Sequence, residues 1–386
     1  MKKDHKVALR LLDGQDYIWA YKYRQPLDGF RPTSAWSAGE EVEDNYGLLL
    51  FPGTPPGDYR LEVRVYHEAD GDLPVTAEGQ KLETFAIEPV VVSRAAFPLS
   101  VEALSMQHSW DGSLDGPIEL LGYELGMPVA EPGEPFRLTL FWRASVKPQS
   151  DYEVALQLVG KDGHVWARGI FPPGNQAYPT SQWESGEVIR SQYNLEINAA
   201  TPKGEHQLSV NLVDKATGQP LSRGEVPLTK LRVTGVRRQF TVPRNIQYPV
   251  QANLDNFVIF RGYDLKATYL KADDTVHLTL YWQAQQRMDT NYTVFVHLLD
   301  DNDQIWGQRD SMPGGGERPT TSWLEGEIVI DQYEMALKPD TPPGEYRVEI
   351  GMYDATTGQR LPVFAKNGER LPQDRILFDQ AITIQY

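Results

Sequence analysis

The chain has no cysteine among its 386 residues. Disulfide bonds, thiolate metal sites and cysteine nucleophiles are therefore excluded. No apolar run approaches the roughly 18 residues of a membrane-spanning helix, so no membrane span is expected. The first twelve residues do not form a signal peptide, because Arg10 interrupts an apolar stretch that is already short. The lack of cysteine is compatible with an exported protein.

Positive charge is also scarce relative to negative charge. The 37 lysines and arginines stand against 53 aspartates and glutamates, which gives a formal net charge of −16. Such a chain repels phosphate backbones and anionic lipid surfaces, so nucleic-acid binding is disfavoured. Helical periodicity is weak, whereas 32 glycines, 28 prolines and 11% aromatic residues are typical of a turn-rich all-β protein.

What the sequence does contain is one motif that occurs three times. It reads Pro-Thr, then tryptophan three positions after the threonine, then Gly-Glu, and its copies begin at Pro32, Pro179 and Pro319. In every copy 21 positions separate the tryptophan from a later glycine that opens the next predicted strand. A fixed spacing of this kind indicates a repeated structural unit.

Three segments of each repeat alternate between apolar and polar residues, as half-buried antiparallel strands do. Tight turns with proline and glycine separate the second and third segments. We therefore predict tandem antiparallel β-sandwich modules of immunoglobulin-like or jelly-roll type, with the strand order left open. The predicted strands are 5–13, 42–50 and 59–65 in the first repeat, 152–160, 189–197 and 206–212 in the second, and 292–300, 329–337 and 346–352 in the third.

The first repeat lacks two strands that the others carry ahead of these segments, at 121–125 and 138–142 and at 261–265 and 278–282. We expect either that residues upstream of Met1 are missing or that another chain completes the sheet. The connectors are expected to be ordered, because they contain apolar residues such as Phe97 and Phe240. The predicted organisation is a truncated first repeat at 1–94, a linker at 95–117, a second repeat at 118–236, a linker at 237–256 and a third repeat at 257–386.

Eight of the nine tryptophans occupy positions that recur between repeats. Trp142 and Trp282 end apolar strands and are predicted to lie in the core. Trp36, Trp183 and Trp323 lie instead in a predicted loop beside proline and hydroxyl residues. Two interpretations stay open for these three indoles, of which we favour the first. Each either closes one end of a sandwich or offers a platform on which a sugar ring stacks.

Carboxylates also recur after the tryptophan. Pairs of carboxylates carry out acid/base chemistry in glycosidases. Three copies of a catalytic pair would be unusual, however, and the middle copy has a serine at one position, so acceptance of backbone N–H groups in a turn is the favoured role. The first position, a ligand-binding candidate together with the three loop tryptophans, holds Glu40, Glu187 and Glu327, and the second holds Asp44, Ser191 and Asp331.

No metal or cofactor site is expected. The acidic run Asp300–Asp303 resembles a calcium loop, but its counterparts at 13–16 and 160–163 resemble hairpin turns. The seven histidines share no repeat position, and no nucleophile is accompanied by a plausible base. We therefore predict no catalytic residue.

The repeat motifs carry a resemblance to a known class of domain. They are similar to the β-sandwich repeats appended to membrane-embedded glycosyltransferases of the dolichyl-phosphate-mannose mannosyltransferase-like class, and to other surface proteins, in Chloroflexi-type bacteria. The resemblance covers the second and third repeats and part of the first, and it implies an extracytoplasmic or cell-surface location without catalytic residues. The segments that carry it are 121–125, 138–144, 178–187, 260–265, 279–284, 294–300, 351–354 and 357–361.

Three hypotheses for function follow. The first is a non-catalytic, extracytoplasmic accessory or spacer module, for which binding of cell-envelope glycan is the leading specific role. The second is a glycan-processing enzyme that uses carboxylates such as Glu327 and Asp331. The third is an assembly module whose open first repeat pairs with a strand of another protein. Fold alone does not choose among them.

Overall fold

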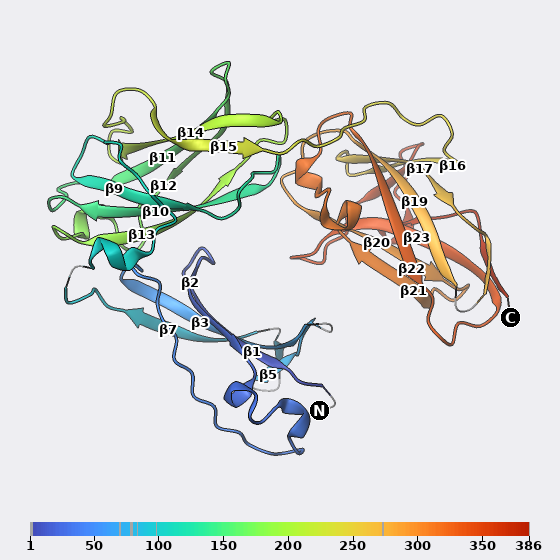
Figure 1. Cartoon of the computed structure of the whole chain (residues 1–386). Coiled ribbons are helices and arrows are strands. Elements are labelled where there is room, and N and C mark those ends of the chain that lie inside the picture. Colours follow the sequence, from blue (N-terminus) through green and yellow to red (C-terminus); the bar gives the residue numbers. More distant parts are fainter. Residues whose placement is uncertain are drawn as a thin grey trace. The chain divides into compact units, whose positions relative to one another are not determined.

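We analysed a computed structural model, which describes residues 3–68, 71–77, 80–82, 84–97, 99–271 and 274–385. The protein is all-β, built from antiparallel sheets joined by loops and short 3-10 turns (Figure 1). No helical segment in these ranges has the length and apolarity to cross a membrane. The chain divides into two compact units. One comprises 1–128, 135–196 and 205–231, and the other 129–134, 197–204 and 232–386.

The second repeat is a complete sandwich of two four-stranded sheets. Its first, second and fifth long strands share one sheet, and the third, fourth, sixth and seventh share the other, an immunoglobulin-like arrangement. The first sheet has the order β13 (Val188–Glu196), β10 (Pro135–Ala144), β9 (Ile118–Leu125), β8 (His108–Ser109). The second sheet has the order β12 (Val165–Phe171), β11 (Tyr152–Val159), β14 (Gly204–Asp214), β15 (Val226–Val233).

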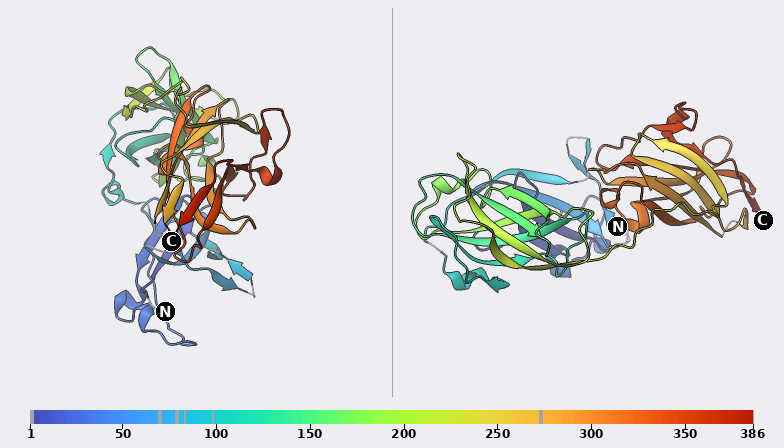
Figure 2. Two further views of the ribbon diagram at one scale, coloured as in Figure 1. Left: turned by 90° about the vertical axis from the view of Figure 1, so that its right-hand side faces the viewer. Right: turned by 90° about the horizontal axis from the view of Figure 1, so that it is seen from above.

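The third repeat has the same plan, and Figure 2 shows its strands from two further directions. One sheet has the order β22 (Ile328–Ala336), β19 (Thr275–Ala284), β17 (Val258–Leu265), β16 (Tyr248–Leu254), β24 (Val363–Ala365). The other has the order β18 (Tyr269–Lys271), β26 (Ile382–Gln385), β23 (Gly344–Asp354), β20 (Tyr292–Leu299), β21 (Ile305–Ser311), and β25 (Ile376–Leu377) also pairs with β23. The alternating residues of β20 and β23 form its core as the cross-strand pairs Val294/Met352, Val296/Ile350 and Leu298/Val348, all without exposed surface.

The first repeat contains the equivalent of one sheet only, within the described residues. In that sheet β1, β2 and β3 take the places of β11, β12 and β14, as the repeat offsets require. Its order is β2 (Ile18–Arg24), β1 (Lys6–Leu12), β3 (Gly57–His67), β4 (Gly71–Asp72), and β7 (Phe85–Val92) also pairs with β3. A separate hairpin joins β5 (Val75–Ala77) to β6 (Gln80–Leu82).

The predicted strand at 42–50 is wrong, because residues 41–50 form no strand. Figure 1 draws this stretch as part of a long blue loop without an arrow. The equivalent segments β13 and β22 pair with β10 and β19, and the described part of the first repeat supplies no such partner. Partly covered and exposed residues nevertheless still alternate from 41 to 49. The sequence pattern of a strand is therefore present without its hydrogen-bonded neighbour.

Both connectors contribute structure to the repeat that follows them. The strand β8 pairs with β9 at a sheet edge, and β16 lies between β17 and β24. In the first connector the 3-10 turn Val101–Leu104 places Leu104 against Phe141 and Val188, and Leu104 is buried. The described parts of both connectors are therefore ordered, as the sequence predicted.

Two tyrosines fix the turn that precedes the sixth strand of a sandwich. The hydroxyl of Tyr59 donates to the carbonyl of Pro55, and that of Tyr346 donates to the carbonyl of Pro342, both at 2.6 Å. A tyrosine that bonds back to the backbone at this corner is a recurrent feature of immunoglobulin-like sandwiches. It occurs here in the first and third repeats, and His206 holds the equivalent position in the second.

A buried histidine on β20 pairs with two carboxylates. His297 Nδ1 lies 2.8 Å from Glu349 Oε1, and its Nε2 lies 3.1 Å from Asp310 Oδ1. Glu349 also accepts from Arg375 Nη1 at 2.7 Å. Burial alone would lower the pKa of His297, but the hydrogen bonds and charges of Asp310 and Glu349 outweigh it and raise this pKa to about 9.

This cluster predicts a local pH dependence. The folded-state pKa of His297 lies above the unfolded value near 6.5, so its stabilising contribution is complete below that pH and is lost as the pH rises towards 9. Replacing His297 with glutamine should remove on the order of 2 kcal/mol of this dependence. Hydrogen exchange of β20 amides between pH 6 and 9, corrected for intrinsic rates, measures it. His277→Gln, on a less buried histidine of the same repeat, is the control, and equal slopes in the two variants would contradict the assignment.

Candidate functional site

The repeated motif forms the same turn in all three repeats, and we call residues 31–40, 178–187 and 318–327 the tryptophan turns. Each contains a 3-10 segment, namely Thr33–Ala35, Thr180–Gln182 or Thr320–Ser322. A proline in extended conformation precedes each segment, and the tryptophan ends it. Proline and hydroxyl residues favour such a turn because they fix φ and bond locally to the backbone.

The threonine of each turn joins the turn to the start of β1, β11 or β20. Its hydroxyl accepts the backbone N–H of His5, Tyr152 or Tyr292 at 2.8–2.9 Å. The same hydroxyl donates to a carbonyl 30 positions before it, and all three threonines are buried. Sequence reasoning missed this role, although the identity of the residue in three copies was a usable signal. The threonines are Thr33, Thr180 and Thr320, and the acceptors are Lys3, Ser150 and Thr290.

The tryptophans close their own turns. The indole N–H donates to the carbonyl five positions earlier, at 3.0 Å for Trp36, 3.3 Å for Trp183 and 2.9 Å for Trp323. Trp183 and Trp323 have no exposed surface, so neither offers a face on which a sugar ring could stack. Trp36, in the repeat with the single sheet, is partly exposed. Trp142 and Trp282 are fully buried in their sandwiches.

Each turn glutamate caps its own turn. Its Oε2 accepts the backbone N–H of the residue three positions earlier, at 2.8 Å in the first and second turns and 2.9 Å in the third. The other carboxylate oxygen meets a side chain nine positions earlier, which is Arg31 for Glu40, Tyr178 for Glu187 and Arg318 for Glu327. Both oxygens of each carboxylate are thus engaged within the turn.

An arginine at the start of the preceding connector adds to this cap in two turns. Arg94 directly precedes the predicted linker at 95–117, and Arg238 lies in the linker at 237–256. Arg94 donates to the carbonyl of Gln182 at 2.5 Å, and its Nε lies 3.5 Å from Glu187 Oε1. Arg238 donates to the carbonyl of Ser322 at 2.9 Å and to Glu327 Oε2 at 2.5 Å. We call Arg94 and Arg238 the connector arginines. They hold equivalent places, because Gln182 and Ser322 each directly precede the tryptophan.

The second repeated polar position holds a loop in each repeat. Its side chain accepts the backbone N–H of the residue 17 positions earlier, at 3.2 Å for Asp44, 2.6 Å for Ser191 and 2.8 Å for Asp331. Burial raises the pKa of Asp331, opposed by hydrogen bonds from Gly314 and Tyr333. Neither Asp331 nor Glu327 has surface open to a substrate. A serine suffices at this position because the role requires only an acceptor.

The acidic hairpin at Asp300 is a turn. One carboxylate oxygen of Asp300 accepts the N–H groups of Asn302 and Gln304, and the other accepts from Trp306 Nε1. Asp13 does the same for the equivalent residues of the first repeat. In the part of the chain that the structure describes, no three histidine, aspartate or glutamate side chains are grouped as metal ligands would be.

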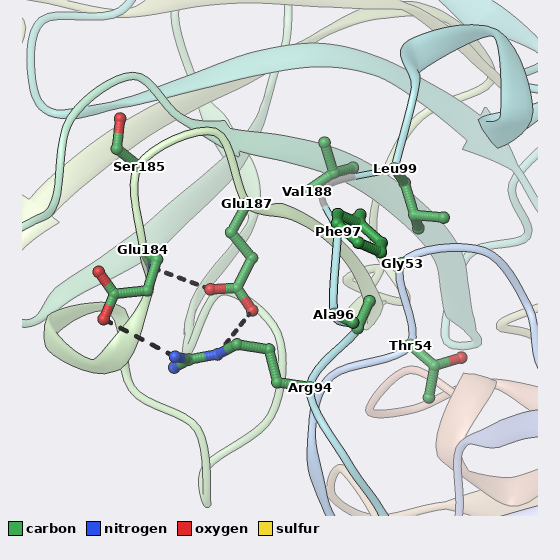
Figure 3. Close-up of a pocket in the computed structure, with 11 residues that line it drawn as sticks. Gly53, Thr54, Arg94, Ala96, Phe97, Leu99, Glu184, Ser185, Glu187 and Val188 are labelled. Carbon is green, nitrogen blue, oxygen red and sulfur yellow. Dashed lines mark hydrogen bonds and ion pairs between the residues drawn. The ribbon is translucent and has the colours of Figure 1, made fainter.

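A cavity of about 230 Å³ lies beside the second tryptophan turn (Figure 3). Figure 3 shows Arg94 reaching between Glu184 and Glu187 at one side of this cavity. Phe97, from the same connector, also lines it and is 82% exposed. The remaining lining residues are Gly53, Thr54, Ala95, Ala96, Leu99, Ser185 and Val188.

The three turn glutamates predict a graded response to one substitution. Glu327 is fully buried between two arginines, so Glu327→Gln should cost about 3 kcal/mol of local stability. Glu187→Gln should cost less, and Glu40→Gln about 0.5 kcal/mol, because Arg31 is half exposed. Exchange of the capped amides of Ser37, Glu184 and Leu324 is the measurement. An equal loss at all three sites would contradict this ranking.

Comparisons with known proteins leave the family open. No family model and no curated protein matches the chain. Among solved structures, it is similar to a mutant of Salmonella alpha-2-macroglobulin, with 11% sequence identity and a TM-score of 0.19. That match covers 100% of this chain, which spans 26% of the length of the matched chain.

Proposed function

We propose that this chain is a non-catalytic array of β-sandwich modules that acts as a spacer or accessory region. The observation that carries the proposal is the use of the repeated polar residues. The threonines, indoles and glutamates of the tryptophan turns bond to their own backbone or to neighbouring arginines. Residues that recur three times therefore serve the fold. The resemblance to repeats appended to membrane-embedded glycosyltransferases supports an extracytoplasmic or cell-surface place for such an array.

Substitution of the carboxylates separates this proposal from the enzymatic alternative. Asp331→Asn keeps an acceptor for the Gly314 N–H while it removes the charge. We expect no release of reducing sugar from a panel of envelope polysaccharides by the unmodified chain or by this variant. Turnover by the unmodified chain that disappears in folded Asp331→Asn or Glu327→Gln would overturn the proposal.

Carbohydrate binding is a second candidate function, and one observation favours it at the cavity beside the second turn. Phe97 presents an exposed aromatic ring next to Arg94, Glu184 and Ser185. An aromatic face beside charged and hydroxyl groups suits a sugar ring, which has apolar C–H faces and polar edges. We therefore propose the connector, rather than the buried indoles of Trp183 and Trp323, as the candidate glycan site.

A fluorescence titration with envelope polysaccharides tests this placement. Saturable binding by the intact chain should weaken at least about tenfold in Phe97→Ala, a loss of roughly 1.4 kcal/mol. Phe240→Ala, at the corresponding aromatic position of the second connector, is the matched control and should retain binding. Binding that survives Phe97→Ala but is lost in Trp36→Ala would move the site to the first tryptophan turn.

A further inference from the structure

The first repeat presents an incomplete sandwich whose missing parts can be identified from the other two repeats. In the second repeat β13 pairs with β10, and β10 pairs with β9. In the third repeat β22 pairs with β19, and β19 pairs with β17. Residues 41–50 hold the same place in the repeat but have no strand partner among the described residues. Two antiparallel strands are therefore the element that this surface lacks.

The sheet of the first repeat also has an apolar face that is incompletely covered. Cross-strand neighbours Val7/Val65, Leu9/Val63 and Leu11/Leu61 form this face. Val7 and all three residues of β3 are partly exposed, whereas their equivalents in the third repeat have no exposed surface. Leu49, in the unpaired segment, is 87% exposed. Burial of such a face stabilises a sandwich by about 25 cal/mol for each Å² removed from water.

The first tryptophan turn lacks a charge that the others receive. Glu187 and Glu327 each meet a connector arginine, and that arginine precedes the two strands of its repeat in sequence. Glu40 pairs with Arg31, and no connector arginine reaches it among the described residues. The glutamate of the first turn therefore has the geometry of the other two without a connector arginine.

We propose that the first repeat is a docking site for a polypeptide segment that carries an arginine followed by two antiparallel β-strands. The arginine binds Glu40 and the backbone carbonyl before Trp36, as the connector arginines do in the other turns. The second strand of the pair adds to residues 41–50, and its apolar residues cover the open sheet face. A segment with the pattern of residues 94–144 or 238–284 has these features in the required order. An arginine comes first, and two antiparallel strands with apolar residues follow it.

A fusion tests whether the surface accepts this occupant. Residues 94–149 are placed directly before Lys3, because Ser150 and Lys3 hold equivalent positions as acceptors of the threonine hydroxyl. Exchange of amides 41–50 should slow by at least about tenfold relative to the unmodified chain. Leu140→Pro in the appended copy alone removes a ladder bond and should abolish this protection. A second fusion, with residues 238–289 before Lys3, repeats the test with an independent sequence.

Glu40→Gln distinguishes docking of the arginine from strand pairing alone. In the fusion this substitution should lower the protection of the turn amides, whereas in the unmodified chain it should have little effect. If neither fusion folds with residues 41–50 protected, the proposal is wrong. It is also wrong if the unmodified chain dimerises with those residues already protected, because a second copy would then be the occupant. Glycan binding at Phe97 is unaffected by either result, so the two proposals fail separately.

Discussion

Burial of one apolar sheet face against a second sheet is the constraint on which each repeat depends. The third repeat satisfies it fully, since the facing residues of β20 and β23 have no exposed surface. The first repeat has the same alternation and the same register between β1 and β3, but only one sheet among the described residues. Strand formation at 41–50 fails there although the local sequence suits it. Pairing partners, more than local preference, decide whether such a segment becomes a strand.

The tryptophan turns show how a small polar network supports this arrangement. Threonine, indole and glutamate each satisfy backbone groups that a buried turn would otherwise leave unpaired, which would cost about 1–3 kcal/mol for each group. The side chain at the second polar position also serves to satisfy a backbone N–H group. Aspartate and serine both occur there because either can accept that hydrogen bond. Reading such residues as a catalytic pair would require a free carboxylate, and Glu327 has none to offer.

Much of the fold could be predicted from the sequence because the three copies of the repeat could be aligned with one another. Period-two alternation located the strands at 152–160 and 292–300, and the motif spacing placed the turns. The strand at 42–50 was predicted wrongly. Alternation of apolar and polar residues shows which side chains share a face, but it does not show whether a neighbouring strand is present to pair with the segment. The buried role of Thr180 and the cluster around His297 could not be predicted from spacing. They depend on contacts between residues 28 and 52 positions apart, which only the sheet pairing brings together.

The connector arginines show which segment of the chain forms a complete structural unit. Arg94 and Arg238 each lie at the start of the connector that precedes the turn they bind, so a repeat is completed by the segment before it. A gene duplication that carried a sandwich without its leading connector would produce a module without its connector arginine. A duplication that carried connector and sandwich together would produce a module that has its own connector arginine, whatever its position in the array. The structural unit of the array is therefore a sandwich together with the connector that precedes it.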